Sequence, residues 1–130
     1  MQEAKQCLII DDDQDDQEIF LMCLQQVNKN VDCAANSDSV DAVAWLANDT
    51  AYTPDFIFVD MNMPKMNGIE CLKKLRKIDR LKDTVIYMYS TTSEGSLVAE
   101  SKRYGASDFI IKPARTAELK EKLAQIFNAA

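Results

Sequence analysis

The sequence has no histidine and only three glycines among its 130 residues, and both shortages limit the chemistry it can support. Without histidine there is no Ser-His or Cys-His pair for nucleophilic catalysis, and no imidazole ligand for a transition metal. The glycines, Gly68, Gly95 and Gly105, stand too far apart for a G-x-G-x-x-G or Walker phosphate loop. These absences exclude histidine-based active sites and glycine-rich nucleotide loops within the chain.

Long hydrophobic runs are absent as well. Even the longest uninterrupted apolar runs, such as residues 42–47, are far shorter than the roughly 20 residues that cross a bilayer. Residues 1–6 lack the charged head and long apolar stretch of a signal peptide. We therefore expect a cytoplasmic protein without membrane insertion.

The cysteines are few and widely spaced, with no C-x-x-C pair and mostly apolar neighbours: Cys7, Cys23, Cys33 and Cys71. Such a pattern is more typical of buried small hydrophobic side chains than of disulfides or a zinc site.

Basic charge is missing from one segment in particular. The chain has 21 acidic and 15 basic residues, and six of the acidic ones lie in the octet 11–18, which holds no base. Removing those six leaves 15 acidic against 15 basic residues, so the net charge of −6 is entirely local. One dense carboxylate cluster argues against a general nucleic-acid or anionic-membrane binder. The single basic run, residues 73–82, has no interleaved aromatic residues that would favour nucleic-acid binding.

Five short apolar runs alternate with stretches of helical spacing. The runs are rich in β-branched and aromatic residues, which indicates buried strands, at 7–10, 31–35, 56–59, 85–89 and 109–111. This alternation predicts an α/β, doubly wound (βα)5 fold of the flavodoxin-like type, in one domain over residues 1–130. We expect a five-stranded parallel sheet with helices on both faces; if its order is 2-1-3-4-5, strands 1, 3, 4 and 5 are successive neighbours.

Polar side chains follow four of these strands. Asp11 to Asp13 follow the first strand, Asp60 the third, Ser90 the fourth and Lys112 the fifth. Because the carboxyl ends of parallel strands meet at one edge of the sheet, these groups are expected to lie side by side.

The chemistry of such a group favours a metal and a phosphate. Clustered carboxylates raise one another's pKa, and a hard divalent cation such as Mg²⁺, Mn²⁺ or Ca²⁺ relieves this. Asp60 would then be a nucleophile that forms an acyl phosphate, with Ser90 and Lys112 stabilising the charge on the phosphoryl oxygens.

Each residue alone also has a simpler interpretation. Acidic residues are common at solvated helix starts, and we interpret Asp13, Asp15, Asp16 and Glu18 in this way. Ser90 alone could be a turn hydroxyl and Lys112 a surface lysine. The joint placement at four strand ends is what favours a site.

Four motifs along the chain match those of one family. They are an acidic pair, a D-x-x-M-P-x-x-x-G pattern, a hydroxyl after the fourth strand and a Lys-Pro pair after the fifth, here Asp11-Asp12, residues 60–68, Ser90 and Lys112-Pro113. In these motifs and their spacing, the sequence resembles the receiver domain of two-component response regulators over nearly its whole length.

The resemblance implies specific roles. Asp60 would be the phosphoacceptor, and Mg²⁺, with Mn²⁺ as a substitute, would be bound by Asp11, Asp12, Asp60 and the backbone carbonyl of Asn62. Phe109 would act with Ser90 as the conformational switch. Lys112-Pro113 would be a cis peptide, and Asn62 and Thr92 would occupy positions that tune dephosphorylation.

The resemblance also implies a function. We expect a single receiver domain without an output domain, a signalling phosphoacceptor that catalyses only its own phosphorylation and dephosphorylation. The phosphoryl donor would be a phosphohistidine on a sensor histidine kinase or a histidine phosphotransfer protein. The output would be phosphorylation-dependent binding of a downstream target protein or onward phosphorelay, from a monomer or weak dimer with no nucleic-acid partner.

Two alternatives stay open at this point. A haloacid dehalogenase-type phosphohydrolase also places D-x-D after its first strand, with Asp11 as nucleophile, but Asp15 stands where Thr or Val is expected. A degenerate receiver would serve as a constitutive interaction module.

Overall fold

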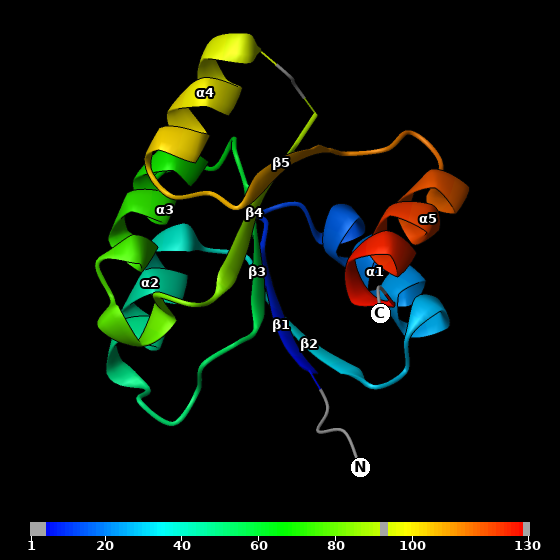
Figure 1. Cartoon of the computed structure of the whole chain (residues 1–130), viewed down its shortest axis with the longest axis horizontal. Helices are drawn as coiled ribbons and strands as arrows, with labels where there is room; N and C mark the ends of the chain where they lie inside the picture. Colours follow the sequence, from blue (N-terminus) through cyan, green and yellow to red (C-terminus); the bar gives the residue numbers. More distant parts are fainter. Residues whose placement is uncertain (1–4, 92–93, 129–130) are drawn as a thin grey trace.

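The computed structural model of the chain describes residues 5–91 and 94–128 (Figure 1). In these residues the strands and helices alternate along the chain: β1 Lys5–Ile10, α1 Gln14–Val27, β2 Val31–Asn36, α2 Ser39–Asn48, β3 Phe56–Asp60, α3 Gly68–Arg76, the 3-10 helix η1 Asp79–Leu81, β4 Val85–Ser90, α4 Gly95–Arg103, β5 Asp108–Ile111 and α5 Thr116–Phe127. The strands form one parallel sheet in the order β2-β1-β3-β4-β5. The predicted α/β fold and strand order are confirmed.

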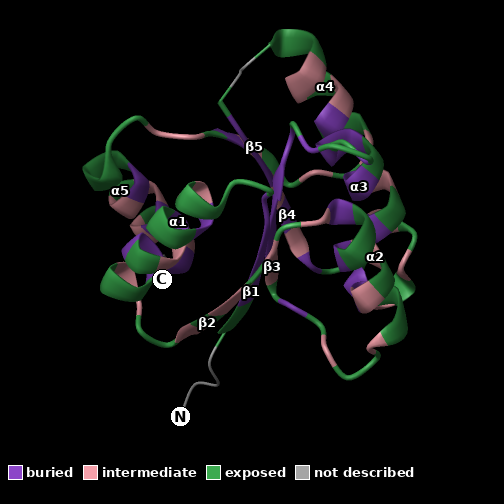
Figure 2. Ribbon diagram, turned by 180° about the vertical axis from the view of Figure 1, so that it is seen from behind, coloured by how far each residue is buried: buried purple, intermediate pink, exposed green. Residues whose placement is uncertain are grey.

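Helices cover both faces of this sheet, with α1 and α5 on one face and α2, α3 and α4 on the other (Figure 1). The strands are therefore apolar on both faces, as their continuous apolar runs predict. Figure 2 shows the buried residues concentrated along the central strands and the inward faces of the helices. On the α1–α5 face, Phe20 packs edge-on against Phe58 at 4.8 Å between ring centroids. The opposite core is mostly aliphatic, with Leu8, Ile10, Ile57, Val59, Leu72, Leu75 and Ile86 fully buried.

The register of the strands aligns their carboxyl ends. Asp60 lies opposite Tyr89, and Ser90 lies opposite Ile111. The backbone N–H of Lys112 then donates to the Ser90 carbonyl at 2.7 Å. The residues that end β3 and β4 and follow β5 are thereby brought to one edge of the sheet.

The turn between β3 and α3 is unusually tight at Gly68. The Gly68 N–H donates to the Met61 carbonyl at 2.9 Å. A Cβ at position 68 would lie 2.5 Å from the Asp60 carbonyl oxygen and 2.7 Å from the Met61 Cα. The glycine that ends the D-x-x-M-P-x-x-x-G pattern is thus required by the close approach of two backbone segments.

The α4 helix is held at its carboxyl end. The Arg76 Nε donates to the Gly105 carbonyl at 2.9 Å, and the Lys73 Nζ lies 4.0 Å from the Tyr104 ring centroid. At the amino end, Glu94 makes no side-chain capping bond, and a Cβ at Gly95 would meet nothing within 4 Å. The carboxyl end is therefore tied to α3, and near the amino end Leu97 packs against the aliphatic core on this face of the sheet.

One expectation about the backbone is wrong. The structure has no cis peptide bond among the described residues, so the Lys112-Pro113 bond is trans. An X-Pro bond favours trans by roughly 0.5–1 kcal/mol, and the Lys112 ammonium reaches its carboxylate partners from the trans bond.

The cysteines agree with their sequence interpretation. Cys7, Cys23 and Cys71 are buried, Cys33 is partly buried, and all four are free thiols. Burial raises the pKa of the Cys71 thiol to about 12, which keeps it protonated at neutral pH.

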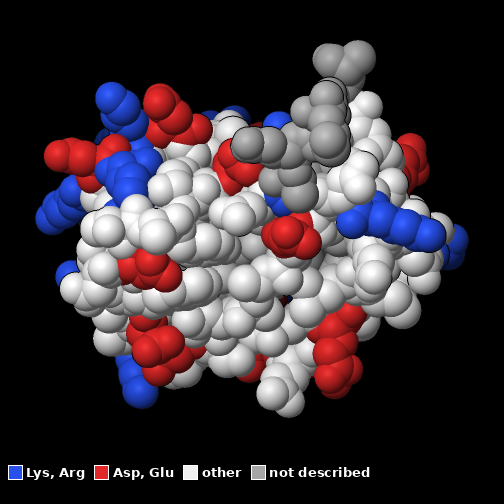
Figure 3. Space-filling view, turned by 90° about the horizontal axis from the view of Figure 1, so that it is seen from below, with Lys and Arg blue, Asp and Glu red and all other residues white. Residues whose placement is uncertain are grey.

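In the described ranges, no helix has the length and apolar character to span a membrane. The face at the amino ends of the strands, seen from below in Figure 3, carries acidic and basic side chains interspersed, and neither sign gathers into one patch there.

Candidate functional site

Three carboxylates meet at the carboxyl edge of the sheet. Asp11 and Asp12 directly follow β1, and Asp60 is the last residue of β3; one oxygen from each lies within 4.8 Å of the others. Asp11 and Asp60 are buried, whereas Asp12 is exposed. Three clustered oxygen donors with no nitrogen or sulfur ligand fit a hard divalent cation such as Mg²⁺.

The neighbouring Asp13 has a different role. Its side chain accepts a hydrogen bond from the Asp16 N–H at 3.2 Å and so caps the amino end of α1. The structure thereby separates Asp11 and Asp12, which join the carboxylate cluster, from Asp13, which caps a helix.

The two buried carboxyls, Asp11 and Asp60, have raised pKa values. Burial, followed by the charge of Asp11, raises the pKa of Asp60 to about 6, although the Lys112 ammonium and the Asn62 N–H lower it. Burial also raises the pKa of Asp11, against the effect of Lys112 and the Asp13 N–H. A cation bound between these carboxylates would favour their ionised forms.

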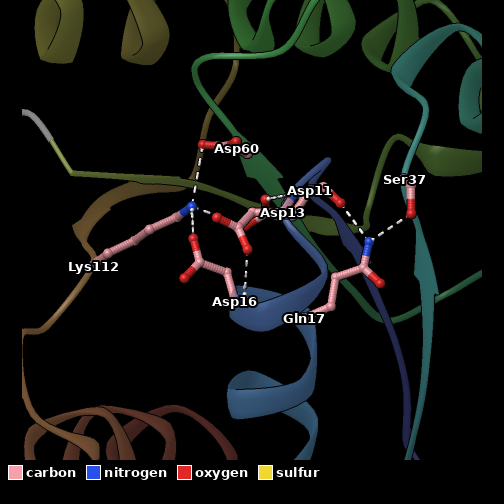
Figure 4. A network of polar contacts seen from close by, with 7 residues as sticks. All are labelled: Asp11, Asp13, Asp16, Gln17, Ser37, Asp60 and Lys112. Carbon is pink, nitrogen blue, oxygen red and sulfur yellow. Dashed lines mark hydrogen bonds and ion pairs between the residues drawn. The ribbon is translucent and has the colours of Figure 1, made fainter.

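Lys112 lies at the centre of a network of ion pairs (Figure 4). Its Nζ is 2.9 Å from the Asp11 Oδ2, 2.8 Å from the Asp16 Oδ2 and 3.4 Å from the Asp60 Oδ1. Burial alone would lower the pKa of Lys112, but hydrogen bonds and charge from Asp16 and Asp11 outweigh this and raise it. The ammonium is thus held beside Asp60 in its charged form.

The contact with Asp16 corrects the sequence interpretation. We interpreted Asp16 as part of a solvated helix start, yet its side chain is only 35% exposed and contacts Lys112. No signal in the sequence identifies this pair, because the contact depends on how α1 is rotated relative to a residue 96 positions away.

Sequence reasoning also missed Gln17. Its Nε2 donates to the Asp11 carbonyl and, at 2.9 Å, to the Ser37 Oγ (Figure 4). Gln17 therefore links the loops that follow β1 and β2. Its position three residues before the buried Phe20 is the signal that could have placed it on the inner face of α1.

The remaining predicted residues lie around this cluster. Ser90 is fully buried at the end of β4, one residue beyond the partner of Asp60. The Asn62 N–H points to the Asp60 carboxylate. Phe109 is half-buried on β5 opposite Met88 and packs against the core beneath α2, α3 and α4. Thr92 lies outside the described residues.

The geometry gives no support to Asp11 as a nucleophile. Asp11 is fully buried. Its Oδ1 accepts from the Asp13 N–H at 2.9 Å, and its Oδ2 accepts from Lys112 at 2.9 Å. Each Asp11 oxygen therefore accepts one hydrogen bond and keeps a lone pair for a cation, which fits a ligand role for Asp11.

Similar proteins share this fold and parts of this sequence. The chemotaxis protein CheY-3 of Vibrio cholerae is 38% identical over 74 residues, which are 57% of this chain and 57% of that protein. In a solved CheX-CheY-BeF3-Mg²⁺ complex from Borrelia burgdorferi, the similar chain is 26% identical with a TM-score of 0.79, covering 95% of this chain and 89% of that one. The phosphorylated cyanobacterial phytochrome response regulator RcpA has the same fold at 23% identity, with a TM-score of 0.85 over 94% of this chain and 90% of that one.

The match to the Vibrio protein thus spans little more than half of that relative's length. The family match is broader, because the response regulator receiver domain matches residues 7–124, from within β1 to within α5. Together with the fold, this match shows that the chain belongs to the response regulator receiver domain family.

Proposed function

We propose that this chain is a signalling phosphoacceptor that takes a phosphoryl group onto Asp60 from a phosphohistidine of a partner protein. The observation that carries the proposal is the convergence of Asp11, Asp12, Asp60 and Lys112 at one edge of the sheet. A carboxylate flanked by an ammonium and a carboxylate pair supplies a nucleophile, a cation site and a positive charge for the phosphoryl oxygens, which suits in-line phosphoryl transfer.

The chemistry divides among the residues of the site. An Asp60 oxygen attacks phosphorus, the bond from phosphorus to the imidazole nitrogen breaks, and the product is an acyl phosphate. Asp11, Asp12 and Asp60 would hold Mg²⁺, with the Asn62 carbonyl as a further ligand, and the bound ion would neutralise charge on the phosphoryl oxygens. Lys112 and Ser90 would donate hydrogen bonds to those oxygens.

The donor belongs to another protein. This chain has no histidine, so a sensor histidine kinase or a histidine phosphotransfer protein would supply the phosphoryl group. Ile19 and Met22 are large apolar side chains of α1 that are 40% and 47% exposed, and Ile19 lines a cleft with Lys112 and Tyr89 beside the site. We expect the donor protein to dock against this exposed part of α1.

The output would follow from a change of shape. Phosphorylation would move Ser90, the loop after it and Phe109, and so alter the face formed by α4, β5 and α5 toward a downstream target or a further phosphotransfer protein. The Borrelia relative was solved bound to CheX together with BeF3 and Mg²⁺, which supports such a phosphorylation-linked partner. Cytoplasmic location and a monomeric or weakly dimeric state remain predictions from the sequence.

Acetyl phosphate tests the proposal without a partner. With Mg²⁺, intact mass spectrometry should show one added phosphoryl group on the wild-type protein and none on Asp60→Asn. Asp11→Asn should be phosphorylated much more slowly, and the exposed Asp15→Asn should match the wild type. Chelation of Mg²⁺ should stop the reaction.

Other outcomes would favour the alternatives. Multiple-turnover phosphatase activity that survives in Asp60→Asn and disappears in Asp11→Asn would indicate the hydrolase. A wild-type protein that shows neither phosphorylation nor any Mg²⁺-dependent binding of beryllofluoride would indicate a constitutive interaction module. Either result would overturn the proposed function.

A further inference from the structure

Asp16 makes the shortest of the three ion pairs of Lys112. The Nζ–Oδ2 distance is 2.8 Å, against 2.9 Å to Asp11 and 3.4 Å to Asp60 (Figure 4). The Asp16 side chain is 35% exposed and that of Lys112 10% exposed. The backbone N–H of Asp16 is fixed by the capping oxygen of Asp13, which sets where its carboxylate lies.

Asp16 also differs from the other two partners in what it can bind. Asp11 and Asp60 belong to the three carboxylates whose oxygens lie within 4.8 Å of one another, and Asp16 does not. A cation bound among Asp11, Asp12 and Asp60 would therefore leave the ion pair between Asp16 and Lys112 in place.

The geometry of an ammonium connects this contact to the phosphoryl group. Lys112 has three N–H donors, and its contacts to Asp11, Asp16 and Asp60 leave the ammonium in different directions (Figure 4). Two short contacts, to Asp11 and Asp16, fix the orientation of the ammonium. The third N–H then points to Asp60, whose oxygen at 3.4 Å is beyond the usual length of a charge-assisted hydrogen bond.

We propose that Asp16 is a positioning residue, which orients the Lys112 ammonium so that one N–H is directed at the phosphoryl oxygens carried by Asp60. This role rests on the proposed function, because it requires a phosphoryl group on Asp60. Asp16 touches neither the phosphoryl group nor the bound cation, and it acts only through Lys112.

The Asp16 carboxylate also repels the phosphoryl group, but this effect is smaller than its positioning of Lys112. A negative charge near the site repels an anion, but Asp16 is neutralised by its own ion pair, and its exposed fraction allows solvent to screen it. Loss of the acceptor is therefore expected to weaken phosphoryl binding, although a negative charge is removed at the same time.

Substitutions at two neighbouring positions separate acceptor, charge and helix effects. Asp16→Ala removes the acceptor, and Asp16→Asn removes the charge but keeps an oxygen acceptor. Asp15→Ala is the matched control, because Asp15 is an exposed acidic residue in the same first turn of α1. The readouts are beryllofluoride affinity in Mg²⁺, measured by 19F NMR, and the side-chain ammonium 15N signal of Lys112 without metal, assigned with Lys112→Arg.

Beryllofluoride affinity should fall about fivefold in Asp16→Ala, the loss expected for one partly exposed charged hydrogen bond. Asp16→Asn should recover most of this loss, and Asp15→Ala should match the wild type. The ordered ammonium signal of Lys112 should persist in wild type and Asp16→Asn and be lost in Asp16→Ala.

Three results would overturn the role of Asp16. They are tighter binding in Asp16→Ala than in wild type, an equal loss in Asp15→Ala, or an unchanged ammonium signal in Asp16→Ala. Failure of the wild-type protein to bind beryllofluoride would instead overturn the proposed function itself, whatever the ammonium signal shows.

Discussion

At the scale of single residues, the surroundings of Asp60 disfavour its ionised form. Its pKa is raised from its ordinary value near 4 to about 6, first by burial and then by the charge of Asp11. The folded protein therefore binds more protons than the unfolded chain between these two pH values. Consequently, the free energy of unfolding falls as pH rises through this window.

Asp60→Asn should therefore be more stable than the wild-type protein at about pH 7, by roughly 1–3 kcal/mol. The difference should shrink at about pH 4, where the wild-type carboxyl is protonated and carries no penalty. Urea unfolding in a chelating buffer at both pH values measures this, with Asp15→Asn as the control. A difference that is equal at the two pH values would contradict the assigned cause.

Two glycines give a matched pair of opposite predictions. Gly68→Ala forces a Cβ to within 2.5 Å of the Asp60 carbonyl oxygen. We therefore expect it to lower the free energy of unfolding by roughly 1–3 kcal/mol and to displace Asp60. In Gly95→Ala the new Cβ meets open space at the start of α4, so the free energy of unfolding should rise by up to roughly 1 kcal/mol. Thermal unfolding of the two variants would refute the steric argument if both shifted in the same direction.

The site could be predicted from sequence only in part, for a physical reason. Asp60, Ser90 and Lys112 could be placed because each lies at the end of an apolar strand, and parallel strands bring such ends together. Asp16 and Gln17 lie on a helix, and their contacts depend on its rotation and distance from the sheet. Strand ends are fixed by topology, whereas the partners of a helix side chain depend on packing, which the local spacing of residues does not specify.

At the scale of elements, Arg80 connects segments that are far apart in the sequence. Its guanidinium donates to the carbonyls of Leu46, Asp49 and Tyr52 at 2.6–2.9 Å and to the Thr53 Oγ1 at 3.0 Å. The carboxyl end of α2 and the loop before β3 are thus bound to η1. Arg80, which the sequence shows only as one residue of the basic run 73–82, is therefore a structural clamp between these segments.

Arg80→Lys should lower the free energy of unfolding by roughly 1–3 kcal/mol, because a single ammonium cannot reproduce the fork of donors. Lys74→Ala, an exposed change in the same basic run, should stay within about 0.5 kcal/mol of wild type. Urea unfolding of the two variants measures this. Coinciding curves would contradict the role of Arg80 as a structural clamp.

At the scale of the whole molecule, the net charge of −6 equals the charge of the six acidic residues in 11–18, and two of these join the carboxylate cluster at the sheet edge. The folded state brings Asp11, Asp12 and Asp60 together, which the unfolded chain does not do. A divalent cation that binds this cluster should therefore stabilise the whole fold by mass action.

Mg²⁺ at ten times its dissociation constant should add about 1.4 kcal/mol to the free energy of unfolding near pH 7. Differential scanning fluorimetry with increasing MgCl₂ measures this, against NaCl at matched ionic strength and against Asp11→Asn. An equal shift with NaCl, or in Asp11→Asn, would show screening of surface charge instead of binding at the site.

The attachment of α4 at its carboxyl end has a mechanical consequence. With that end tied to Arg76 and Lys73, we expect α4 to pivot there if it moves. Nine residues at about 1.5 Å each give a length of roughly 13 Å, so a tilt of about 10° would displace the amino end by roughly 2 Å. The largest displacement would therefore fall near Leu97, and its packing against the core would have to change with the tilt.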